Sequence, residues 1–386
     1  MFTPSELERI PVPLQRRMAE LEINIMQDVV RRININSEIT RSADWQIYKL
    51  TQLGQSNAYI KEQIQRSLKL SDEEINALYE NAVETGYTRD KSLYEATGKT
   101  FVEFKDNAEL QQLIQATIRQ TKSEMVNICQ SLGFTIEMNG KTVFTPMAQY
   151  YQQVLDTAIL EVTTGTFDYN ASLKKVVNEM TKSGLRTVDY ASGWTNRIEV
   201  ASRRALMTGI TQVANTINSN NADILDTDKF EVSWHGSARP SHQEWQGRVY
   251  TKQQLIDICG LGSVSGLCGA NCYHSYYPFI DGVSERTYTD KQLEEMNAKE
   301  NKLMEYKGIK YNTYEATQKQ RQLETLMRKQ RQDIKLLKGG NVKEDDLVIV
   351  QAKYRGTMAR YKAFSDALGL PQQRERIYMD GLGRVA

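Results

Sequence analysis

The stretch PLQRRMAELEINIMQDVV, residues 13–30, sets the pattern for most of this 386-residue chain. Its apolar side chains recur at steps of three or four residues, as they do along one face of an α-helix. They are Leu14, Met18, Leu21, Ile25 and Val29. Pro13 fits the first turn of a helix, where the missing N–H is not needed. We therefore expect a helix that starts after Pro13 and buries one apolar face.

The placement of proline predicts long helices elsewhere. Only seven prolines occur, and none lies within residues 14–145, 147–239 or 279–370. Because an interior proline breaks a helix, these segments can be continuously helical. Helical periodicity covers residues 110–132, 146–165, 172–184, 195–225, 290–306, 314–337 and 341–368. In addition, SDEE at 71–74 predicts the start of a helix reaching about Val83, since Ser and Glu at this spacing form a capping box.

Two segments break the helical rhythm. FTIEM (134–138) and KTVF (141–144) flank Asn139-Gly140, a dipeptide favoured in two-residue hairpin turns. Between residues 229 and 282, glycine, aromatic, histidine and cysteine residues crowd together and helical periodicity stops. We predict a mainly α, elongated helical protein with one short β-hairpin and a small central α+β Cys/His-rich module. The predicted domains are an N-terminal helical region (1–133), a hairpin plus helical region (134–226), the Cys/His-rich module (227–288) and a C-terminal helical region (289–386).

Composition excludes several classes of protein. Lys and Arg number 49 against 48 Asp and Glu, so the net charge is +1 and any basic surface must be local. Four cysteines in a chain of this length do not make a disulfide scaffold. The opening MFTPSE lacks the features of a signal peptide, and no apolar run approaches the ~18 residues that span a bilayer. We expect a soluble protein made in a reducing cytosol, with no membrane partner.

Histidine and cysteine cluster in one short region. All three histidines and three of the four cysteines fall within residues 235–274. Imidazole and thiolate are the ligands that Zn²⁺ favours, and four of them would fix a glycine-rich loop. The candidates are His235, His242, Cys259, Cys268, Cys272 and His274. At most four of these six bind one zinc ion, and the Cys-x3-Cys-x-His spacing does not select them. A metal-free alternative, in which these side chains pack among the aromatic residues of 273–279, stays open.

The same region carries a resemblance to a known family. HGSARPSHQEWQGRVY (235–250) resembles the signature of tailed-phage minor capsid proteins, and GLCGANCYHSYYPF (266–279) resembles its second half. YKAFS (361–365), GLP (369–371) and QRER (373–376) resemble the same group. The chain is thus similar to the phage minor capsid protein (type 2) family, which is related to Mu-type head morphogenesis proteins.

The resemblance implies a function in the phage head. It implies a low-copy virion protein inside the capsid near the portal, which assists head assembly and is present in the host cytoplasm while heads assemble. The implied partners are the portal protein, other head proteins and packaged double-stranded DNA, bound without sequence preference. The resemblance implies no catalytic residue, so we expect neither an enzyme nor a small-molecule substrate.

Two alternatives stay open. A zinc-dependent nuclease or hydrolase would use His242, Glu244, Cys272 and His274. A non-specific DNA-binding ejection protein would use the local excess of positive charge on the predicted helix 314–337. Its candidate nucleic-acid-binding residues are Lys319, Arg321, Arg328, Lys329, Arg331 and Lys335. A solvated helix face is the simpler explanation of these cations.

Overall fold

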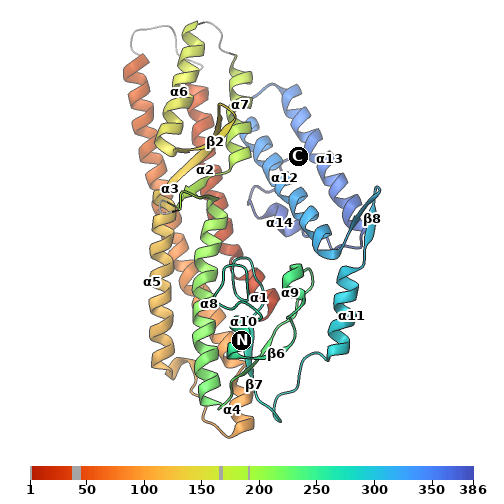
Figure 1. Cartoon of the computed structure of the whole chain (residues 1–386). Helices are drawn as coiled ribbons and strands as arrows, with labels where there is room; N and C mark the ends of the chain where they lie inside the picture. Colours follow the sequence, from red (N-terminus) through yellow and green to blue (C-terminus); the bar gives the residue numbers. More distant parts are fainter. Residues whose placement is uncertain (1, 37–44, 165–167, 190–191) are drawn as a thin grey trace. The chain divides into compact units, whose positions relative to one another are not determined.

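A computed structural model describes the chain except for residues 1, 37–44, 165–167 and 190–191 (Figure 1). The described residues are predominantly α-helical with a few small antiparallel sheets, as the sequence predicts. They divide into two compact units. Unit 1 comprises Met1–Pro13, Glu73–Ser123 and Arg204–Lys319, and unit 2 comprises Leu14–Asp72, Glu124–Arg203 and Gln320–Ala386. The domain limits proposed from the sequence remain predictions.

Helices dominate the first half of the chain. The elements there are α1 (Pro4–Arg9), α2 (Val12–Asn36), α3 (Trp45–Thr88), α4 (Lys91–Thr97), the 3-10 helix η1 (Phe104–Asp106), α5 (Ala108–Gln130), β1 (Leu132–Met138), β2 (Lys141–Pro146), α6 (Met147–Thr164), α7 (Tyr169–Ser183), β3 (Arg186–Val188) and β4 (Thr195–Arg197).

The second half contains the small module and the C-terminal helices. Its elements are α8 (Ile198–Ile224), β5 (Lys229–Val232), α9 (Pro240–Gln243), β6 (Val249–Thr251), α10 (Lys252–Asp257), β7 (Tyr276–Phe279), α11 (Asp290–Asn301), β8 (Met304–Tyr306), β9 (Ile309–Tyr311), α12 (Thr313–Gly339), α13 (Glu344–Ala367) and α14 (Arg374–Tyr378). The helix predicted over 290–306 ends early, because residues 304–306 pair with β9 instead.

In unit 2 the apolar stripe of α2 is core, as predicted. Leu14, Met18 and Ile25 are each 0% exposed. The predicted hairpin is confirmed: Met138 pairs with Lys141, and Asn139 and Gly140 both have positive φ, as a type I′ turn requires. The hairpin belongs to a larger sheet with strand order β2-β1-β3-β4, which the sequence did not predict.

The predicted helix start at Ser71 is wrong. Helix α3 runs without a break through this position, where Ser71 is 0% exposed. Most of the buried positions before it are polar, as in Gln52, Ser56 and Ser67, and Ile60 is the large apolar residue among them. Periodic hydrophobicity is therefore weak in this part of the helix, although the helical burial pattern is present.

In unit 1, helices α3, α5 and α8 pack closely. The Tyr79 hydroxyl lies 2.8 Å from Thr121 Oγ1 and donates to the carbonyl of Leu206 at 3.4 Å. A Cβ atom at Gly209 would lie 1.8 Å from that hydroxyl, so only glycine fits there. No helix among the described residues is both long and apolar enough to cross a membrane.

Candidate functional site

The Cys/His-rich module is built on a three-stranded antiparallel sheet with order β6-β5-β7. Phe230 and Val232 of β5 form a core with Trp245, Leu255 and other buried side chains of the module. A glycine-rich loop crosses this core between α10 and β7. A Cβ at Gly266 would lie 2.2 Å from the carbonyl oxygen of Gly260, so the loop can fold back on itself only with glycine there. The sheet and the loop together hold the histidines and cysteines.

Three of the six predicted ligands converge in the interior of the module. His242 lies on α9, whereas Cys272 and His274 lie just before β7. Their exposed fractions are 2%, 8% and 1%. Cys272 Sγ lies 3.3 Å from His274 Nδ1 and 3.9 Å from His242 Nδ1. All three potential ligand atoms lie within 4.8 Å of one another.

The outer hydrogen bonds of the two imidazoles fix which nitrogen carries a proton. His242 Nε2 is 2.8 Å from the Ser265 carbonyl oxygen, which can only accept, so this nitrogen donates. His274 Nε2 is 2.8 Å from Gln246 Oε1. The backbone N–H of His235 also donates to Gln246 Oε1, which identifies this atom as an acceptor. Both Nδ1 atoms are therefore left with lone pairs, and both lone pairs face the Cys272 sulfur.

Burial sets the charge state of this cluster. It lowers the pKa of His242 and lowers the pKa of His274 well below its ordinary value, with His235 and His242 adding to the second effect. Burial also raises the pKa of the Cys272 thiol, although the backbone N–H of His274 partly offsets this. At neutral pH the cluster holds two neutral imidazoles and one thiol. That single S–H can satisfy only one of the two Nδ1 lone pairs.

The other three candidates take different positions. Cys268 lies beside the cluster, with its Sγ 3.6 Å from the His274 carbonyl oxygen, and burial raises the pKa of its thiol well above the ordinary value. The His235 ring contacts the His274 ring with centroids 4.2 Å apart and planes tilted by 39°, while its own Nδ1 is 2.9 Å from the Gly236 carbonyl oxygen. Cys259 belongs to the apolar core, where burial raises the pKa of its thiol to about 12.

The surroundings of the cluster include residues that the sequence did not single out. Gln246 and the Ser265 carbonyl orient the two imidazoles, and the Arg239 guanidinium donates to the carbonyls of Ser265 and Ala270 in the same loop. No motif marks these partners, because two of them act through backbone oxygen. Glu244, proposed as a general base in the hydrolase alternative, is exposed and is not part of the His242, Cys272 and His274 group.

The cations predicted on helix 314–337 fall into two sets. Three of them bind carboxylates: Arg328 pairs with Glu199 at 3.1 Å, Lys329 with Asp333 at 2.8 Å, and Arg331 with Asp380 at 2.7 Å. Arg331 is only 1% exposed. Lys319 and Lys335 are exposed, and Arg321 is half-buried. The structure therefore leaves only part of this set at the surface.

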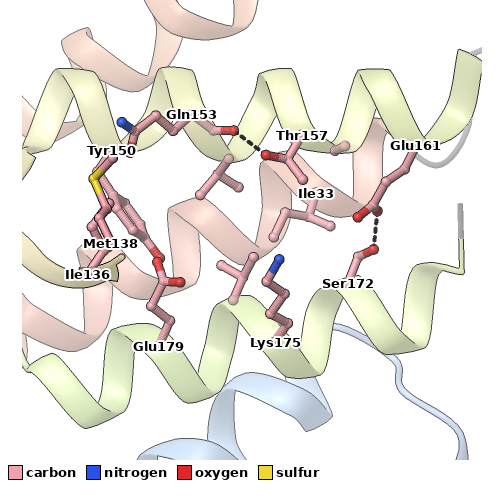
Figure 2. A pocket seen from close by; sticks show the side chains of 13 residues that line it. Ile33, Ile136, Met138, Tyr150, Gln153, Thr157, Glu161, Ser172, Lys175 and Glu179 are labelled. Atoms are coloured by element: carbon pink, nitrogen blue, oxygen red, sulfur yellow. Dashed lines mark hydrogen bonds between the residues drawn. The ribbon is translucent and has the colours of Figure 1, made fainter. Parts of the chain in front are cut away.

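Unit 2 contains a cavity of about 280 Å³ among α2, β1, α6 and α7 (Figure 2). In Figure 2 the Tyr150 hydroxyl faces the Glu179 carboxylate, and burial raises the pKa of both groups. Ser172 donates a hydrogen bond to Glu161 on the opposite side. These two pairs thus face one another across α6 and α7, and none of the residues predicted as ligands lines the cavity.

Comparison with known proteins defines the class to which this fold and module belong. Over 302 residues the chain is 25% identical to a "Structural protein" of Lactococcus phage LL-H, an alignment that covers 73% of this chain and 77% of that protein. The family described as "Phage minor capsid protein 2" matches residues 2–364. The chain therefore belongs to this family of phage minor capsid proteins, as the resemblance in residues 235–250 and 266–279 implies. No solved structure matches it.

Proposed function

We propose that this chain is a low-copy component of the phage head, located inside the capsid near the portal, where it assists head assembly. The observation that carries the proposal is the match of residues 2–364 to a family of minor capsid proteins. Its partners are the portal protein and other head proteins, which it meets in the host cytoplasm during assembly. A non-enzymatic role agrees with the exposed position of Glu244, outside the buried histidine and cysteine group.

Within this role, a zinc ion bound by His242, Cys272, His274 and Cys268 fixes the central module. Zn–S and Zn–N bonds of about 2.3 and 2.0–2.1 Å at a tetrahedral angle separate S and N by about 3.6 Å. The two S···N separations of 3.3 and 3.9 Å bracket that value. Each imidazole also donates its other N–H to a fixed oxygen, which is the usual support of a metal-binding histidine. The ion would replace the thiol proton and satisfy both Nδ1 lone pairs.

Metal content of the purified protein tests the zinc site. Protein prepared without a metal-affinity step should contain about one zinc per chain, measured by inductively coupled plasma mass spectrometry. The variant C272S/H274A should lose it, whereas C259S should keep it, because Cys259 lies in the apolar core. Zinc should also fall in C268S but not in H235A. Wild-type protein without zinc, or a C272S/H274A variant that keeps its zinc, contradicts the site. Loss of zinc in H235A with zinc kept in C268S contradicts Cys268 as the fourth ligand.

A phage with a nonsense codon in this gene tests the role in assembly. Without the chain, the yield of DNA-filled infectious heads should fall, and wild-type protein supplied in trans should restore it. E244Q should restore it equally well, since no catalytic step depends on that carboxylate. Normal heads in the absence of the chain would contradict a role in assembly, and failure of E244Q to complement would favour the hydrolase alternative.

Non-specific contact with packaged double-stranded DNA completes the proposal. Exposed Lys319 and Lys335 with the half-buried Arg321 support it on α12. Replacing these three residues by glutamine should lower the salt dependence of DNA binding by about 0.9 for each phosphate that their side chains neutralise. An unchanged salt dependence would remove α12 from the proposal.

A further inference from the structure

Four exposed cations lie on α13, outside the helix singled out by the sequence. They are Lys353, Arg355, Arg360 and Lys362. Within the described part of the chain, none of their side chains has a hydrogen bond or an ion pair. No Asp or Glu occurs from residue 347 to residue 365, and the nearest acidic residue of the helix is Asp366, four positions after Lys362, which accepts a hydrogen bond from Gln372. This differs from α12, where three of the six candidate cations bind carboxylates.

The register of α13 arranges these cations in two rows. Tyr354, Tyr361 and Phe364 are buried and define the inner face of the helix. Helix α13 lies beside α12 (Figure 1), and the Tyr361 hydroxyl donates to the Glu324 carboxylate of α12 at 3.0 Å. At 3.6 residues per turn, residues seven apart lie nearly on one line. Lys353 and Arg360 therefore form one row, and Arg355 and Lys362 form a second row on the other flank.

Small residues fill the outward strip between the two rows. The strip consists of Ala352, Gly356, Ala359 and Ala363, all of which are exposed. A Cβ at Gly356 would have no atom within 4 Å, so space in front of the helix is open there. A surface with cations on both flanks and no long side chain between them allows a polyanion to approach the backbone closely.

We propose that α13 binds double-stranded DNA by lying in the major groove, with one cation row on each phosphate strand. The groove is about 12 Å wide and admits an α-helix, whose diameter with side chains is about 10–12 Å. The seven-residue step within a row is about 10 Å long, so both members of a row reach phosphates of one strand. Alanine and glycine face the bases and carry no side-chain hydrogen-bonding group, so the contact is independent of sequence.

The charge of the strip also argues against two other occupants. A second copy of α13 would bring four cations against four cations, because the acidic residues of this helix lie at its two ends, in Glu344, Asp345 and Asp346 at the start and in Asp366 near the end. An acidic protein helix would satisfy the charge, but it would not require two rows separated by the width of a groove. The inference rests on the proposed contact with packaged DNA and not on the role in assembly or on zinc. A DNA-binding assay with purified components therefore tests the proposal for α13 independently of the proposals for head assembly and zinc.

The salt dependence of binding to a 30-base-pair duplex of random sequence, measured by fluorescence anisotropy, tests the proposal. Four phosphate contacts contribute about −3.6 to the slope of log K against log salt, or a loss of about 150-fold in affinity between 50 and 200 mM. The variant K353Q/R355Q/R360Q/K362Q should lose this contribution and bind at least tenfold more weakly at 100 mM salt.

A matched control removes the same charge elsewhere. K61Q/R66Q/K69Q/K105Q replaces four exposed cations of α3 and η1 and should leave the slope within about 0.5 of the wild type. Equal losses in the two variants would show a non-local charge effect and overturn the proposal. Binding of polyglutamate in place of the duplex, lost in the α13 variant, would assign the strip to an acidic protein and overturn it as well.

The position in the groove has its own test, in which the charge stays constant. G356L places a bulky side chain in the open strip, where no atom of the protein opposes it. The fold should be kept, judged by circular dichroism and thermal unfolding, and duplex affinity should fall at least fivefold. A duplex carrying glucose groups on cytosine C5, which fills the major groove, should also bind more weakly. Unchanged affinity in both experiments would contradict binding through the major groove.

Discussion

Arg331 is the buried cation of α12, and its replacement tests whether it acts inside the fold or at the surface. Its side chain is 2% exposed. Nε and Nη2 donate to the Asp380 carboxylate at 2.7 and 3.0 Å, and Nη2 also donates to the Gly383 carbonyl at 2.8 Å. The guanidinium lies over the Tyr378 ring, 4.7 Å from its centroid. R331M would keep the aliphatic packing and leave Asp380 charged, buried and without its cation.

The expected cost follows from the burial of both partners. Breaking a buried ion pair by removing one partner costs about 3–5 kcal/mol, because the remaining charge is uncompensated. For a unit of this size the loss lowers Tm by roughly 10 °C. The second change in R331M/D380N removes the unpaired charge and keeps an oxygen for the backbone N–H of Leu382, which Asp380 accepts at 3.1 Å. This double variant should recover more than half of the loss.

Urea denaturation and thermal unfolding of the three proteins measure the effect, and a DNA-binding titration completes the test. R331M should leave the salt dependence of duplex binding unchanged, since Arg331 does not reach the surface. A loss below about 1 kcal/mol, or a double variant no more stable than R331M, would refute the reasoning from burial. A lower salt dependence in R331M would return Arg331 to the DNA-binding set.

Further substitutions probe the core. G209A should destabilise the protein by about 1–3 kcal/mol in thermal unfolding, because its Cβ would lie 1.8 Å from the Tyr79 hydroxyl. The control G356A should instead stabilise it by up to about 1 kcal/mol through the gain in helix propensity. Equal effects of the two substitutions would contradict the close packing at Gly209. Burial raises the pKa of Glu22 above 4.5, so the folded state binds the proton more tightly. The free energy of unfolding should therefore fall as pH rises from about 4.5 through the raised pKa. Urea denaturation at a series of pH values should show a smaller fall in E22Q than in the wild type. C259S should cost about 1–3 kcal/mol without loss of zinc, since it places a hydroxyl in an apolar core; loss of zinc would contradict this assignment.

The sequence predicts helices well where burial and hydrophobicity coincide. On α2 most buried positions carry apolar residues, chiefly leucine, isoleucine and methionine, and the helix follows from their spacing. In the first part of α3 most buried positions are polar, as in Gln52, Ser56, Ser67 and Ser71, so the same burial leaves a weak apolar signal. Ser71 followed by acidic residues then imitates a helix start in the middle of a continuous helix.

Short strands and ion pairs depend on partners that lie far away in the chain. Strands β3 and β4 have three residues each and exist because β3 pairs with β1, more than 50 positions earlier. Similarly, the spacing from Met327 to Ile334 places Arg331 on the buried face of α12, but its partner Asp380 lies 49 positions further along the chain. Local pattern therefore predicts the helix that carries this arginine but not the arginine's role.

The candidate metal site shows the same division. The sequence alone identifies six possible ligands in one module, because histidine and cysteine are scarce elsewhere in the chain. The choice among them depends on the loop that places His242 opposite Cys272 and His274, and on Gln246 and a backbone carbonyl that orient the rings. These contacts are made by the fold and leave no spacing rule in the sequence.

Quantitative mass spectrometry of purified virions tests the central claim most directly. Isotope-labelled peptides from this chain, from the portal protein and from the major capsid protein would give their ratios in DNA-filled particles. A minor head component should be present in every particle preparation at a small fraction of the major capsid protein and should cross-link to the portal. A chain abundant in infected cells but absent from the particles would contradict the account.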